Sequence, residues 1–198
     1  MHKVAYPALL VVLTCMSLVG ASLHPPQVYD SGGEKVRQVL EALRADSQAE
    51  PPPKKTYQLS QAQINAYLLE ELSQQEESFV LSFSVLLGDG NFTTMIEVDF
   101  DQLRPAEQTT PWDLLRILFK GKQTLEVEGV LNVSQGRGNY HIQQAQFSGV
   151  KLPISLVHDI LMSLGQIQPA LLDPTSSFPM PYGIESVVIS PDQVVIET

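Results

Sequence analysis

Alternating apolar and polar residues predict three β-hairpins in the chain. A short segment containing Gly, Asn, Asp or Pro, which favour tight turns, separates the two strands of each pair. The predicted strand pairs are 79–87 with 92–100, 123–134 with 139–150, and 184–190 with 193–197. The second strand of the middle pair is polar on both faces at Gln143 and Gln144, so we expect one of its faces to meet water.

Apolar residues three and four positions apart predict amphipathic helices between these hairpins and ahead of them. Ser60 followed by Gln63 is a capping box, and Pro111 stands where a first helical residue is expected. Gly121 and Gly165 are placed to end the last two helices. The predicted helices span residues 34–45, 60–75, 110–121 and 152–165, and the segment 166–182 is predicted to be a Pro-rich loop.

These elements predict an α+β fold, because helices alternate with strands that pair with their neighbours in the chain. We expect an antiparallel sheet of about six strands, in three hairpins, packed on two to three amphipathic helices. Residues 56–198 are predicted to form this single domain. Residues 22–55 are predicted to be a flexible segment, in which the first helix is tethered by a stiff spacer containing Pro51, Pro52 and Pro53. A mobile first helix would suit a lid, a helix that docks on a partner or a simple spacer.

The first 21 residues have the pattern of a cleavable export signal. Lys3 gives a positive start, residues 5–19 are almost continuously apolar, and the predicted cut follows Ala21. The same run could instead be retained as an uncleaved anchor. Cys15 is the one cysteine in the sequence and lies inside the signal, so the exported chain is predicted to have no disulfide. We therefore expect a periplasmic or secreted protein.

The net negative charge of the chain limits the kinds of molecule that it is expected to bind. The full chain has 12 Lys and Arg residues, 22 Asp and Glu residues and a formal charge of −10. Cleavage after Ala21 would remove one lysine and no acid, which leaves −11. A nucleic-acid partner is not expected, because binding to phosphates requires clustered positive charge. A stable electrostatic hold on an anionic membrane is not expected either.

No cluster of residues in the sequence has the pattern of a known catalytic site. The histidines after the signal, His24, His141 and His158, have no second histidine at ligand spacing, so we expect no metal. A Gly-x-Ser-x-Gly turn is absent, and adjacent His158 and Asp159 on a helix would point about 100° apart. The Gly-containing turns lie between strands and not before a helix, so they do not suggest a phosphate site. We expect neither an enzyme nor a cofactor.

Three short motifs resemble small bacterial envelope proteins of the tubular lipid-binding (TULIP-like) type. They are Leu59–Leu68, which contains Ser60, Ile64, Asn65 and Tyr67 at the family spacing; Phe147–Pro153, which enters a helix; and Met180–Ile184, which enters the last hairpin. The resemblance covers about residues 59–198 and implies a curved antiparallel sheet that cradles a long helix and binds lipid near a cell envelope. This chain differs from the family pattern in its short helices, its Pro-rich loop at 166–182 and its additional first helix.

Two functions follow as alternatives. If the sheet curves away from the helices, a groove between them would bind a lipid or another apolar ligand. If the space is filled, the protein would be a structural or protein-interaction module of the cell envelope with a solid core and an envelope protein as its partner. The residues expected to line such a groove are apolar and belong to the first hairpin and the last helix: Phe79, Leu81, Phe83, Ile96, Val98, Leu156, Ile160 and Leu164. Each of them is also a suitable core residue.

Overall fold

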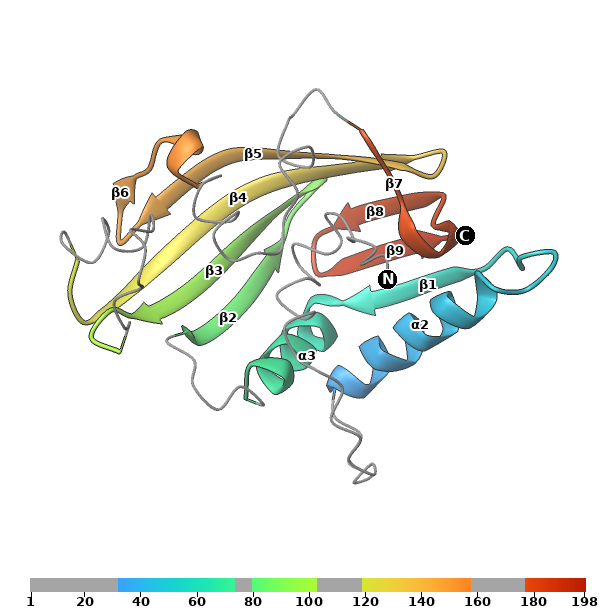
Figure 1. The fold of residues 1–198 in the computed structure, drawn as a ribbon, viewed down its shortest axis with the longest axis horizontal. Coiled ribbons are helices and arrows are strands. Elements are labelled where there is room, and N and C mark those ends of the chain that lie inside the picture. Colours follow the sequence, from blue (N-terminus) through green and yellow to red (C-terminus); the bar gives the residue numbers. More distant parts are fainter. Residues whose placement is uncertain (1–31, 74–79, 103–118, 158–176) are drawn as a thin grey trace, which may run out of the picture.

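The computed structural model describes residues 32–73, 80–102, 119–157 and 177–198. They form an α+β fold with one curled antiparallel sheet of nine strands, which confirms the predicted fold class (Figure 1). Within the described residues, two complete helices, a 3-10 turn and one helical turn at residues 154–157 accompany the sheet. Their bounds are α2 Gly32–Asp46, α3 Gln61–Ser73 and η1 Pro181–Gly183, with β1 Thr56–Ser60, β2 Val80–Leu87, β3 Asn91–Asp99, β4 Lys122–Ser134, β5 Arg137–Phe147, β6 Val150–Lys151, β7 Phe178–Pro179, β8 Ser186–Ser190 and β9 Gln193–Glu197.

The long strand β4 organises the sheet. One edge of β4 pairs with β5, and the other edge pairs first with β3 and then, beyond the end of β3, with β8. The strand order is therefore β1-β9-β8-β4-β3-β2, with β5 on the opposite side of β4. The β2–β3 hairpin and the β8–β9–β1 group consequently leave the same edge of β4 as two separate arms (Figure 1).

Three of the nine strands lie outside the predicted set of six. β1 is five residues long and pairs with the last strand, β9, over Thr56–Ser60. β6 and β7 have two residues each and pair with the two ends of β5. β7 and η1 lie within residues 166–182, where the sequence predicts only a loop, because single backbone pairs such as Gly138 with Phe178 leave no periodic pattern.

Gln143 and Gln144 place polar side chains on both faces of β5 for a structural reason. Glu128 of β4 faces Gln144, whereas the next residue, Gly129, faces Ile142. Gln143 is therefore an extra residue on β5, a β-bulge that interrupts the alternation. Beyond the bulge, Ile142 and Tyr140 return to the buried face.

Helix α3 covers the outer edge of β2, which is the last strand on its side of the sheet. The Asn65 side chain accepts a hydrogen bond from the Val85 backbone N–H at 2.7 Å and donates one to the Val85 carbonyl at 2.9 Å. Gln61 accepts a further bond from the Leu87 N–H. These side chains satisfy backbone groups that would otherwise remain open for another strand. The capping box is formed as predicted, since the Ser60 N–H bonds to Gln63 and the Gln63 N–H bonds to Ser60.

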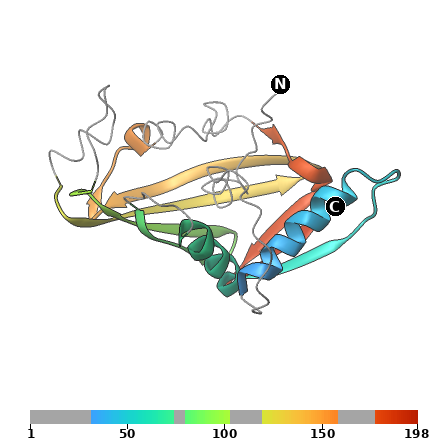
Figure 2. The same ribbon diagram turned by 60° about the horizontal axis from the view of Figure 1, so that its bottom comes forward.

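Helix α2 packs against α3 and the β8–β9–β1 arm, on the inner side of the curled sheet (Figure 2). Its apolar stripe belongs to the same core as the strands, with Val36 1%, Val39 4% and Leu43 0% exposed. The expected flexibility of residues 22–55 stays a prediction. Any movement of α2 would have to separate this buried stripe from the core.

Aromatic rings fill the other end of the inner face. Phe147 lies 4.6 Å from Phe119 and 5.3 Å from Phe100 between ring centroids, with edge-on geometry in both pairs. Phe147 and Val157 are completely buried. We call Phe100, Phe119 and Phe147 the aromatic cluster. Edge-to-face contacts of this kind stabilise a core beyond the burial of area alone.

Several predicted features fall outside the described residues. These are the export signal at 1–21, residues 22–31, most of the predicted helix 110–121 and the part of helix 152–165 beyond Val157, whose first turn is helical at residues 154–157. Among the described residues, no helix combines the length and the apolar composition that a membrane crossing requires.

Candidate functional site: an apolar cavity beneath helix α2

A cavity of about 50 Å³ lies where α2 and α3 meet the two arms of the sheet. Its walls come from α2, α3 and the strands β1, β2, β3, β4, β8 and β9, so it forms only when both arms and both helices are in place. We call it the α2 cavity. Every lining residue is apolar apart from the hydroxyl of one tyrosine: Val36, Val39, Leu40, Leu59, Ile64, Tyr67, Leu68, Leu87, Phe92, Leu131, Ile189, Val194 and Ile196.

The volume determines what can occupy this space. One water needs roughly 10–15 Å³ on this measure, but a water also needs polar partners that an apolar wall does not supply. An engineered apolar cavity of about 150 Å³ in another protein accepts benzene. At 50 Å³ the α2 cavity is too small for a hydrocarbon chain unless one wall moves.

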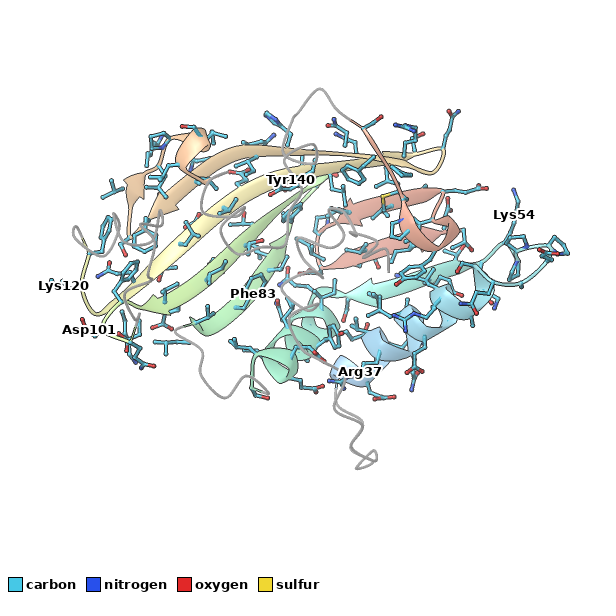
Figure 3. All side chains as sticks on the ribbon, viewed as in Figure 1. Arg37, Lys54, Phe83, Asp101, Lys120 and Tyr140 are labelled. Atoms are coloured by element: carbon cyan, nitrogen blue, oxygen red, sulfur yellow. The ribbon has the colours of Figure 1, made fainter. Side chains whose placement is uncertain are left out.

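Partly exposed polar contacts hold helix α2 against its neighbours, and one set of them lies near the start of the helix. Arg37 forms ion pairs with Glu70 at 2.9 Å and with Glu71 at 3.2 Å, both on α3, and its guanidinium lies 5.2 Å from the centre of the Tyr67 ring (Figure 3). Partial burial alone would lower the pKa of Arg37, but its hydrogen bonds to Glu71 and Glu70 raise it. Burial raises the pKa of Tyr67 to about 12, with Glu71 adding to the effect.

A second polar group fastens the end of α2. Asp46, the last residue of the helix, accepts a hydrogen bond from Lys55 at 2.8 Å and another from the hydroxyl of Tyr57 on β1. These two bonds lower the pKa of Asp46. Burial and the nearby Asp46 raise the pKa of Tyr57 to about 12. Polar contacts therefore fix α2 at both ends, to α3 and to β1.

Five of the eight predicted groove residues are described, and they lie at the end of the sheet away from this cavity. Phe83 and Ile96 face one another on β2 and β3, in a row continued by Leu125 and Phe147 (Figure 3 labels Phe83). Phe83 and Val98 are buried, while Leu81, Ile96 and Leu156 are half-buried. None of these five lines the α2 cavity. Phe79, Ile160 and Leu164 lie outside the described residues, so a groove at this end stays a prediction.

Sequence reasoning identified the elements of the α2 cavity but not the cavity. The stripes Val36, Val39, Leu40 and Ile64, Tyr67, Leu68 were recognisable from helical spacing. Their meeting depends on α2 crossing α3 beside a strand, β1, that the sequence analysis did not predict. The alternation of Tyr57 and Leu59 was the available signal for that strand.

Polar chemistry is sparse in the described structure. Within that part of the chain, His, Cys, Asp and Glu side chains nowhere gather in threes in a way that could hold a metal ion. His141 lies exposed on β5, opposite Val130 of β4. In residues 32–73, 80–102, 119–157 and 177–198, one buried polar side-chain atom has no hydrogen-bond partner, the hydroxyl oxygen of Tyr140.

Comparison of the chain with protein-family models, with curated proteins and with solved structures finds no match.

Proposed function

We propose that this protein is an exported, non-enzymatic protein of the bacterial envelope that binds a lipid or another apolar ligand between its helices and its sheet. The observation that supports the proposal is the α2 cavity, an uncharged space lined by thirteen residues from both helices and both arms of the sheet. The groove expected from sequence lies between the first hairpin and the last helix, whereas the α2 cavity lies under the first helix. A ligand would enter by displacing α2 from the sheet.

The energy needed for this displacement can be estimated from the contacts that α2 would lose. The ion pairs of Arg37 are partly exposed, and such pairs typically contribute about 0.2–1 kcal/mol each. Exposing Val36, Val39 and Leu43 would cost roughly 1.5–3 kcal/mol for each side chain. Each methylene that a ligand buries returns about 0.8 kcal/mol. Together these contributions come to about 5–11 kcal/mol, so a chain of about six to fourteen methylenes would offset the displacement, and we expect ligands with at least a medium-length hydrocarbon chain.

A reversible cross-link between α2 and α3 tests this mode of entry. A Cβ built on Gly32 would lie 3.2 Å from the Cβ of Ala66, close to the roughly 3.8 Å that a disulfide requires. In a chain expressed without residues 1–21, Gly32→Cys with Ala66→Cys would therefore form its one disulfide, because Cys15 is absent. The single variant Gly32→Cys is the matched control.

The neutral probe N-phenyl-1-naphthylamine, which fluoresces in apolar surroundings, reports binding. We expect the wild type and the control to bind the probe, the oxidised double variant to bind at least tenfold more slowly, and dithiothreitol to restore the rate. Equal rates before and after reduction would show that the probe enters elsewhere. No fluorescence with the wild type would contradict ligand binding altogether.

A specific observation favours the second candidate function, a structural or protein-interaction module with a solid core. The α2 cavity is only about 50 Å³, and α2 is packed into the core at Val36, Val39 and Leu43. If apolar probes fail to bind, this function becomes the better account. Its test is in-cell cross-linking of the full chain, which should then capture one specific envelope protein.

A further inference from the structure

Tyr140 carries a polar atom that the fold itself does not satisfy. The residue lies on β5 and is 2% exposed, and its hydroxyl oxygen has no hydrogen-bond partner among the residues that the structure describes (Figure 3). A buried hydroxyl left without a partner typically costs about 1–3 kcal/mol. Such a group calls for a specific explanation, and a phenylalanine would fill the same space without this cost.

The position of Tyr140 connects it with the α2 cavity. Its ring stacks on Phe92, with centroids 5.9 Å apart and an angle of 20° between the ring planes. Its partner across the β4–β5 ladder is Leu131. Phe92 and Leu131 both line the cavity, so Tyr140 stands directly behind two adjacent parts of its wall.

Gly129 lets the Tyr140 ring and its hydroxyl pack directly against the backbone of β4. A Cβ built on Gly129 would lie 3.2 Å from the Tyr140 hydroxyl oxygen and 3.2 Å from the tip of the Phe92 ring. Any larger residue at 129 would push both rings away. The absence of a side chain at this position therefore brings the hydroxyl and the cavity wall together over the backbone of β4.

The chemistry of the surroundings limits what the hydroxyl can bind. The cavity wall carries no charged residue, and the full chain has a net charge of −10. Burying a carboxylate or phosphate there without a cation would be costly. Burial raises the pKa of Tyr140, so its hydroxyl stays protonated and remains a donor at neutral pH. A neutral oxygen acceptor meets these conditions.

We propose that Tyr140 is the polar anchor of the ligand site, donating a hydrogen bond to an uncharged carbonyl or ether oxygen of an apolar ligand whose hydrocarbon chain fills the α2 cavity. The ligand class is thus a neutral lipid, such as a fatty-acid ester, and neither a free fatty-acid anion nor a phospholipid headgroup. This inference rests on the proposed function. It adds one hydrogen-bond donor, the Tyr140 hydroxyl, to a site whose wall is apolar.

The test compares two ligands of equal chain length, methyl dodecanoate and dodecane, as competitors of N-phenyl-1-naphthylamine. We expect Tyr140→Phe to weaken the binding of methyl dodecanoate about tenfold, because one buried hydrogen bond is lost. The binding of dodecane should stay unchanged. The unfolding midpoint of ligand-free Tyr140→Phe should equal or exceed that of the wild type. The matched control is Tyr182→Phe, because Tyr182 is half-buried and does not line the cavity. This substitution should change the binding affinity of neither ligand.

The outcomes separate the two proposals. If Tyr140→Phe weakens the binding of both ligands equally, or of neither, the role of Tyr140 is overturned while the binding of apolar ligands stands. A lower unfolding midpoint in ligand-free Tyr140→Phe, with no selective loss of the ester, would also overturn it by indicating a bound water as the hydroxyl's partner. If neither ligand displaces the probe from the wild type, the proposed function itself fails.

Discussion

The two ends of the inner face of the sheet are built from the same alternating pattern but are filled differently. At one end the aromatic cluster packs Phe147 edge-on against Phe100 and Phe119. At the other end, mostly aliphatic side chains from two helices and both arms of the sheet converge with the rings of Tyr67 and Phe92 and leave the α2 cavity. Large flat rings on neighbouring strands can close a gap, whereas branched side chains brought together from six or more elements fit less closely. The comparison favours placing the proposed ligand site at the cavity end, because the aromatic end is closely packed.

The largest effect is expected from removing the centre of the aromatic cluster. Phe147→Ala deletes a fully buried ring in contact with two others, which should lower the free energy of unfolding by about 3–5 kcal/mol. Urea unfolding followed by fluorescence measures the change. A loss below about 1.5 kcal/mol would mean that this end is loosely packed as well, and the contrast between the ends would disappear.

A matched pair of smaller changes probes both ends with the same added methylene. Val98 is fully buried on β3 beside the aromatic cluster, whereas Val194 on β9 lines the α2 cavity. Val98→Ile should overpack its site and lower the free energy of unfolding by about 1–3 kcal/mol. Val194→Ile should be neutral or raise it by up to about 0.8 kcal/mol, because the methylene enters empty space. Equal effects in urea unfolding of the two variants would contradict an unfilled cavity.

The smallest effect concerns the attachment of α2 and depends on pH. The pKa of Asp46 is lowered in the folded protein by its bonds to Lys55 and Tyr57, so its stabilising effect is fully present above its unfolded pKa of about 3.9. That effect is lost as the pH falls through the lower folded pKa. Asp46→Asn should therefore unfold at lower urea concentration than the wild type at pH 6, and the difference should shrink below about pH 4. A difference that stays constant from pH 6 to pH 3 would show that the charge of Asp46 does not fasten α2.

Much of the fold could be predicted because it depends on local patterns. The capping box at Ser60 and the alternation between Phe92 and Val98 follow from a few neighbouring residues, and both lie in the expected elements. β1 was harder to recognise, since its five residues pair with β9 at the far end of the chain. The packing of α2 likewise depends on long-range contacts, such as those of Arg37 with Glu70 and Glu71.

The candidate site could be predicted only as a class of surface. Apolar stripes show that a residue is buried, but they do not show whether the space between two stripes is filled. The predicted groove residues Phe83 and Val98 are buried beside well-packed neighbours, while the cavity formed where Val39, Leu131 and Val194 meet. Tyr140 gave no signal in the sequence, because an aromatic residue on a strand is ordinary. Its importance comes from a hydroxyl without a partner, which only the three-dimensional arrangement reveals.

Methyl-group NMR of the chain labelled at valine and leucine, titrated with methyl dodecanoate, tests the central claim most directly. The account predicts shifts concentrated on the methyl groups around the α2 cavity, those of Val36, Val39 and Val194, with Val98 and Val157 at the aromatic end unchanged. Shifts centred on Val98 and Val157, or no shifts at saturating ligand, would contradict a ligand site beneath α2.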